Sequence, residues 1–183
     1  ENLILAEKKV NIHKKLNIEK NNYIVVTAHR AENVDNEKRL RGIIDGLMLV
    51  SQFTKLPIIF PIHPRTLKNL TKFNIEQPKE IQFIEPLGYL EFLQLEAHAK
   101  LFITDSGGLQ EEACILKIPC VTIRDNTERP ETIDAGINIL AGTSPNKILN
   151  SAKEMLNYNG KWINPFGDGK AGEHIIDIWL KNK

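Results

Sequence analysis

Six short runs of apolar, largely β-branched residues recur along the chain, and longer polar segments separate them. The runs cover residues 23–27, 57–62, 81–84, 101–104, 119–123 and 137–140. Continuous apolar runs of this length are typical of strands that are buried on both faces of a sheet. Parallel neighbours need crossovers of about a dozen residues or more, and the segments between the runs allow this. The sequence therefore predicts an α/β fold, a Rossmann-like doubly wound parallel sheet of about six strands covered by helices.

Helical periodicity fills the intervals between these runs. After Asn36, a plausible N-cap, apolar residues recur at helical spacing, and further helices are expected at 65–73, 89–99, from about 129, at 145–157 and at 170–180. The chain of 183 residues is long enough for one core. We expect residues 1–20 to form a helical lead-in or linker, 21–169 the Rossmann-like domain, and 170–183 a terminal helix.

Composition excludes several classes of protein. Lys and Arg number 24 against 23 for Asp and Glu, so no basic field for nucleic acid is present. The longest apolar runs have five to seven residues, short of the ~20 that span a bilayer, and no signal peptide opens the chain, so no membrane partner and a cytoplasmic location are expected. Cys114 and Cys120 lie in apolar runs without metal-ligand spacing; buried free thiols and no metal are expected.

A glycine-rich turn follows the fourth apolar run, at residues 104–112. Two glycines at the start of a helix let the backbone approach a ligand, and free N–H groups there attract phosphate, although such turns also simply join a strand to a helix. Other polar clusters follow strands as well, among them residues 28–33, which are expected to form a loop. Since the carboxyl ends of parallel strands meet at one sheet edge, these clusters predict a binding site: His29-Arg30, His63-Pro64-Arg65, Pro86-Leu87-Gly88, Ser106-Gly107-Gly108 and 124–131.

Six motifs in order resemble the carboxyl-terminal half of the non-hydrolysing UDP-N-acetylglucosamine 2-epimerases. They are TAHRAEN (27–33), PIHP (61–64), PLGYLEF (86–92), TDSGGLQEE (104–112), RDNTERPE (124–131) and NPFGDGKA (164–171). The resemblance implies the second domain of a glycosyltransferase-B type two-domain fold, in which two Rossmann-like domains face across a cleft. One departure is Ala31 after Arg30, where the family usually has a second arginine.

The resemblance also implies a set of ligands for UDP. The substrate-binding residues would be Ser106, Gly107, Gly108 and Arg129 for the diphosphate, Glu112 for the ribose, and Phe92 with the backbone near Leu87 for uracil. A guanidinium fork suits a diphosphate. Without the resemblance, Arg129 could instead pair with Glu128 or Glu131, Glu112 could be a solvated helix residue, and Phe92 could belong to the core.

His29 is the one catalytic residue that the resemblance assigns to this chain. It would lie near the leaving diphosphate, where an imidazole can donate a hydrogen bond or a proton, although an isolated histidine after a strand is more often structural. Arg30 and His63 match positions that the family uses for a second, activating UDP-N-acetylglucosamine. The chain alone leaves open whether that site survives with Ala31.

The implied reaction is inversion at carbon 2 by elimination and re-addition of UDP, without a cofactor. The family takes its proton-transferring carboxylates from an amino-terminal domain whose motifs are not found here, so this chain is expected to bind UDP and UDP-N-acetylglucosamine without turnover, with that domain as its partner and a homodimer as the full-length form. Two alternatives remain: the donor-binding half of a related glycosyltransferase, and a receiver-like module that uses Asp105.

The terminal helix carries more apolar residues than one buried stripe requires, among them Ile175, Ile176 and Trp179. We expect this surface, with Leu3 to Leu5, to dock on the amino-terminal domain, and Trp179 to be partly exposed. The alternative is that both segments fold back onto the sheet of their own domain.

Overall fold

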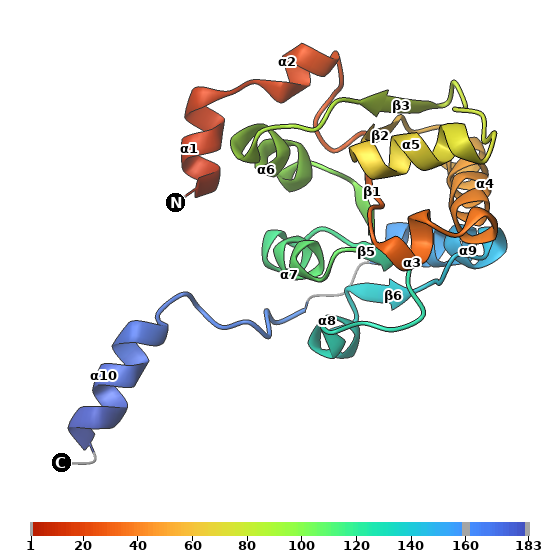
Figure 1. Cartoon of the computed structure of the whole chain (residues 1–183). Helices are drawn as coiled ribbons and strands as arrows, with labels where there is room; N and C mark the ends of the chain where they lie inside the picture. Colours follow the sequence, from red (N-terminus) through yellow and green to blue (C-terminus); the bar gives the residue numbers. More distant parts are fainter. Residues whose placement is uncertain (1, 159–161, 182–183) are drawn as a thin grey trace.

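A parallel sheet of six strands lies at the centre of the structure, a computed structural model that describes residues 2–158 and 162–181 (Figure 1). Residues 1, 159–161 and 182–183 of the expected segments lie outside the described residues. The strand order is β3-β2-β1-β4-β5-β6. The strands are β1 Ile24–Thr27, β2 Ile58–Pro61, β3 Ile81–Ile84, β4 Leu101–Thr104, β5 Cys120–Thr122 and β6 Asn138–Leu140. This confirms the predicted doubly wound fold.

Helices cover both faces of the sheet (Figure 1). On one face lie α3 Ala31–Val34, α4 Glu37–Thr54, α5 Pro64–Lys72 and α9 Pro145–Leu156. On the other lie α1 Asn2–Lys9, α2 Ile12–Leu16, α6 Tyr89–Ala97 and α7 Gly107–Leu116, while α8 Pro130–Asp134 leads into β6. Successive side chains of a strand point to opposite faces, so Ile24 and Val26 join the α4/α9 core and Tyr23 and Val25 the α6/α7 core.

Capping and periodicity in the sequence predicted most of the helices, with α3 as the exception. The side chain of Asn36 accepts a hydrogen bond from the backbone N–H of Arg39 and caps α4, as predicted. The expectation of a plain loop over 28–33 was wrong, because Ala31 to Val34 form the short helix α3. Asn33 and Val34 are buried there, and the side chain of Asn33 donates hydrogen bonds to the residues that directly follow β4 and β5, which holds this turn in place.

The first helices pack on the domain. Ala6 of α1 is fully buried, and the backbone N–H of Ile12 donates to the side chain of Gln94 on α6 at 2.9 Å. The hydroxyl of the buried Tyr23 lies 3.0 Å from Nε2 of His13 on α2, within hydrogen-bond distance. The lead-in therefore covers the α6 side of the sheet.

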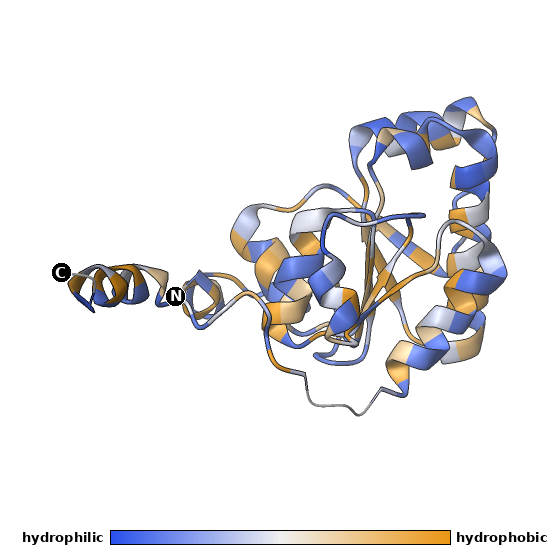
Figure 2. Ribbon diagram, turned by 90° about the horizontal axis from the view of Figure 1, so that it is seen from below, coloured by the Kyte–Doolittle hydropathy of each residue, from blue (hydrophilic) through white to orange (hydrophobic). Residues whose placement is uncertain are grey.

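The terminal helix α10, Ala171–Lys181, stands away from the sheet (Figure 1) and has no buried residue. Figure 2 shows the apolar character of much of this helix, and Trp179 is 58% exposed, as expected from the sequence. Within the described ranges, no helix combines the length and apolar character that crossing a membrane requires.

Candidate functional site

The carboxyl ends of β1 and β4 lie side by side at the centre of the sheet, where the strand order reverses direction. The hydroxyls of Thr27 and Thr104, the last residues of these strands, are 2.7 Å apart. Ligands of open α/β sheets bind at such a switch point. The loops that carry His29 and Ser106 start directly after these two threonines, so the fold brings together residues far apart in the sequence.

Asp105 links these two loops. Its side chain is fully buried and accepts hydrogen bonds from the backbone N–H groups of His29, at 3.0 Å, and Arg30, at 2.9 Å, and from the side-chain amide of Asn33, at 3.1 Å. From the sequence, Asp105 was considered only as a receiver aspartate, and this linking role was missed. The sequence feature that could have predicted this role is the position of Asp105, a carboxylate between a buried strand and a glycine-rich turn.

The same carboxylate orients the imidazole of His29. Nδ1 of His29 lies 3.3 Å from Oδ1 of Asp105, and the side chain of His29 is 40% exposed. A carboxylate at Nδ1 favours a proton on that nitrogen, so Nε2 is the nitrogen available to a ligand. This is the arrangement that an acid or base needs for a reproducible direction of proton transfer.

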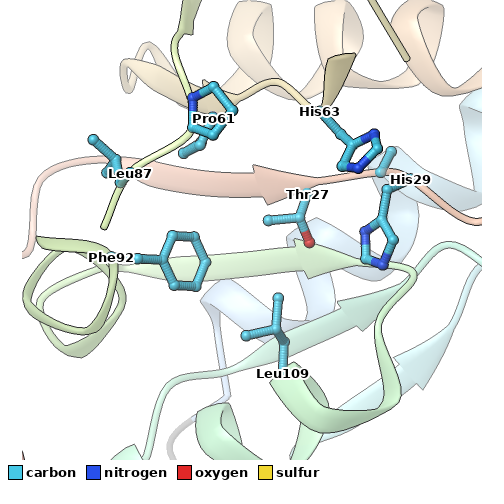
Figure 3. A pocket seen from close by; sticks show the side chains of 9 residues that line it. Thr27, His29, Pro61, His63, Leu87, Phe92 and Leu109 are labelled. Atoms are coloured by element: carbon cyan, nitrogen blue, oxygen red, sulfur yellow. The ribbon is translucent and has the colours of Figure 1, made fainter. Parts of the chain in front are cut away.

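A cavity of about 220 Å³ lies beside His29 (Figure 3). His63, the N-cap of α5, faces it from the next loop, with its ring centroid 6.1 Å from that of His29. The other lining residues are mostly apolar: Thr27, Ala28, Pro61, Pro86, Leu87, Phe92 and Leu109. Four of the predicted site residues, His29, His63, Leu87 and Phe92, therefore share one cavity.

Phe92 has two sides. Its ring packs edge-on against the buried ring of Phe102, with centroids 6.2 Å apart, and it also forms part of the cavity wall (Figure 3). Both interpretations from the sequence, core and ligand surface, thus describe part of its environment. An aromatic ring fixed from behind in this way is suited to receive a flat base on its open side.

The N-terminus of α7 is accessible. Ser106 is the N-cap but makes no side-chain capping hydrogen bond, and a helix start leaves its first N–H groups without intrahelical partners. A Cβ on Gly108 would meet no atom within 4 Å, whereas one on Gly107 would lie 3.3 Å from Oε2 of Glu128. The packing of the chain therefore does not require glycine at 108, while close approach of a ligand would.

Arg129 precedes α8 and pairs with Glu111 of α7, not with the side chains of Glu128 or Glu131 that the sequence suggested. It also donates to the backbone oxygen of Glu128 at 2.8 Å. The guanidinium is about one third exposed. It lies at the α7 side of the site, and Glu111 occupies part of its hydrogen-bonding capacity.

A second cation, Arg124, lies in the cluster 124–131 that the sequence predicted at this sheet edge, but it was given no role of its own there. It is 6% exposed and donates to Glu32 at 2.8 Å and to Glu128 at 2.6 Å, which joins the loops after β1 and β5. The Arg124 guanidinium lowers the pKa of Glu128 to about 2. Arg30 adds to this effect electrostatically, which places Arg30 on the same side of the sheet edge.

Glu112 is half-buried on α7 and lines a separate cavity of about 240 Å³ between α1, α6 and α7, which shares no lining residue with the cavity at His29. The two cysteines are free and buried, as expected. Among residues 2–158 and 162–181, no three His, Cys, Asp or Glu side chains are grouped so that they could hold a metal ion.

The comparisons with known proteins agree with this geometry. Residues 2–180 match the sequence model of a family described as UDP-N-acetylglucosamine 2-epimerase. The chain is 50% identical to an enzyme of that description from Methanocaldococcus jannaschii and 52% identical to one from Methanococcus maripaludis, in both cases over 100% of this chain and 52% of the relative. The chain thus spans about half the length of these curated relatives.

A solved structure gives the same result. The crystal structure of the Methanocaldococcus jannaschii UDP-GlcNAc 2-epimerase in complex with UDP-GlcNAc and UDP superimposes with a TM-score of 0.86 at 50% identity. The match covers 98% of this chain and 51% of that one. The fold around the candidate site is therefore that of one half of such an enzyme.

Proposed function

Because the chain belongs to the UDP-N-acetylglucosamine 2-epimerase family, we propose that it is the nucleotide-sugar-binding half of an enzyme that interconverts UDP-N-acetylglucosamine and UDP-N-acetylmannosamine. The observation that carries this proposal is the pairing of His29 with buried Asp105 at the β1/β4 switch point, beside a cavity walled by Phe92. In this reaction the sugar loses UDP and the carbon-2 proton, which leaves a 2-acetamidoglucal. A proton then returns to carbon 2 on the other face, and UDP adds back to carbon 1.

The nucleotide would lie along the start of α7. The N–H groups after Ser106 bind the diphosphate, and Arg129 adds a cation once a phosphate oxygen replaces Glu111 as its partner. Uracil stacks on Phe92, and the carboxylate of Glu112 accepts hydrogen bonds from the ribose hydroxyls.

His29 acts on the leaving group. With Nδ1–H held by Asp105, a protonated His29 donates its Nε2 proton to the departing UDP as the bond from carbon 1 to oxygen breaks. Asp105 accepts from Nδ1–H and keeps the imidazole in this orientation during the transfer. Arg30 and His63, on the same edge, are proposed to contact a second, activating UDP-N-acetylglucosamine.

Removal of the carbon-2 proton needs a base, which we assign to the half of the relatives that this chain does not span. The exposed apolar residues of α10, including Ile175 and Ile176, are proposed to dock on that half, and they are 66% and 58% exposed here. A homodimer of the full-length protein remains a prediction of the family resemblance, and a cytoplasmic location remains a prediction from the short apolar runs of the sequence.

Calorimetry with UDP tests the binding proposal. UDP should bind the 183-residue chain weakly, and Glu112→Ala should weaken binding by ~1–2 kcal/mol, as for the loss of a hydrogen bond to a charged group. Glu154→Ala, on an exposed position of α9, is the matched control and should bind like the wild type. Neither heat nor a shift in melting temperature at millimolar UDP would contradict the proposal.

Proton exchange tests the division of labour. In heavy water, this chain alone should leave the carbon-2 proton of UDP-N-acetylglucosamine unexchanged, whereas the full-length enzyme should exchange it. Exchange by the chain alone would show that a base lies within these residues, and a His29→Ala variant would then decide whether it is His29.

A further inference from the structure

Glu96, on α6, is a carboxyl group that the roles above leave unused. Its side chain is fully buried, and in the described part of the chain no N–H or O–H donor lies within hydrogen-bond distance of either carboxyl oxygen. Buried carboxyl groups that receive no hydrogen bond are rare in folded proteins, because such a group loses its water without compensation. This position therefore calls for a physical explanation.

The groups around Glu96 leave one natural acceptor. Burial, and after it the Glu112 carboxylate of the facing helix α7, acting as a hydrogen-bond acceptor and a negative charge, together raise the pKa of Glu96 to about 10. A further titratable neighbour is the thiol of Cys120 on β5, whose pKa is raised by burial. At neutral pH, Glu96 is therefore a neutral acid with one O–H to donate, and the carboxyl group of Glu112 is the acceptor beside it.

Glu112 itself has two sides. It is half-buried, it interacts with the carboxyl group of Glu96 on the facing helix α6, and it also forms part of the wall of the cavity between α1, α6 and α7. A carboxylate in this position can accept a hydrogen bond from inside the protein with one oxygen while the other remains available to a ligand.

We propose that Glu96 is a positioning residue, which holds the Glu112 carboxylate in place for the ribose of the nucleotide through a carboxyl–carboxylate hydrogen bond. This rests on the proposed function, in which Glu112 binds the ribose. A charge-assisted O–H to carboxylate hydrogen bond is short and strong. It fixes the rotamer of Glu112 before the ligand arrives, so the ribose hydroxyls meet an acceptor that is already oriented.

The test compares UDP with 2′-deoxy-UDP, because the ratio of their affinities isolates the ribose contact from the uracil and diphosphate contacts. Wild type should prefer UDP. Glu96→Leu, which removes the donor and keeps an apolar side chain, should lower this preference by about tenfold while the melting temperature is unchanged or higher. Glu96→Gln can still donate from its amide and should keep most of the preference.

A pH comparison gives a second measurement that a purely structural role would not change. Between about pH 7 and pH 10, wild type should lose preference for UDP, because Glu96 ionises and then repels Glu112. Glu96→Gln should keep its preference over the same range. Ionisation of the uracil affects both nucleotides equally and cancels in the ratio.

The outcomes separate the two proposals. If wild type binds no UDP, or binds both nucleotides equally, the assignment of Glu112 to the ribose fails. If wild type discriminates and Glu96→Leu discriminates equally well, the positioning role is overturned and the ribose contact stands. If Glu96→Leu does not fold, the pH comparison decides: an equal loss of preference for UDP over 2′-deoxy-UDP at high pH in wild type and in Glu96→Gln would overturn the positioning role.

Discussion

Nδ1 of His29 lies 3.3 Å from Oδ1 of Asp105, although 76 residues separate the two in the sequence. The two residues lie just after the ends of the neighbouring parallel strands β1 and β4. The carboxylate of Asp105 also accepts hydrogen bonds from the backbone N–H groups of His29 and Arg30. One buried side chain thus sets both the course of the β1 loop and the direction of the imidazole.

Replacing Asp105 should therefore destabilise the protein. Asp105→Asn removes a charged acceptor from buried donors, and we expect the free energy of unfolding to fall by ~2–3 kcal/mol. The matched control is Asp125→Asn, at an exposed ion pair with Arg39, which should cost less than about 1 kcal/mol. Denaturant unfolding measures both, and equal effects would mean that the buried network contributes little.

The two glycines of α7 should respond differently to alanine. Gly108→Ala places its Cβ in open space, so the melting temperature should be kept or raised, while affinity for UDP should fall by about tenfold or more because the methyl group lies where the diphosphate approaches. A Cβ on Gly107 would lie 3.3 Å from Oε2 of Glu128, a tight contact, so Gly107→Ala should lower the melting temperature, unlike Gly108→Ala. Unchanged UDP affinity in Gly108→Ala would argue against a diphosphate at this helix start.

Stability should decrease as the solution is acidified below neutrality, in part through His13. Burial lowers the pKa of His13 below its ordinary value of 6.5, so the unfolded chain binds a proton that the folded chain does not. The free energy of unfolding should therefore fall as the pH drops from 6.5 towards the folded-state pKa, and be independent of this group above 6.5. His13→Gln should flatten the pH dependence of the urea midpoint over this range, whereas His174→Gln, on exposed α10, should leave the slope as in wild type.

Deleting α10 should leave the rest of the domain intact. None of its residues is buried, so removing residues 170–183 should change the free energy of unfolding by less than about 0.5 kcal/mol. Thermal unfolding of the shortened chain measures this. A large loss would mean that the helix packs on the sheet in solution, and the proposal that it docks on the other half would then fail.

The sequence alone determined which segments become strands and most of those that become helices, with the short helix α3 as the exception. The buried runs around Val25 and Phe102 could only be interior strands, and Asn36 marked the start of α4, because periodicity and capping are local properties of the chain. Parallel strands then required all the polar loops to gather at one edge, so the pattern of strands was enough to assign His29, His63 and Ser106 to one region.

Tertiary structure decided which of these side chains meet. Arg129 pairs with Glu111 instead of its sequence neighbours, Asp105 holds His29, and Glu96 lies buried beside Glu112. None of these pairs follows from spacing along the chain, because each joins different loops or helices. Their partners depend on the crossing of helices and on burial, and burial determines whether a carboxyl group such as Glu96 keeps its proton.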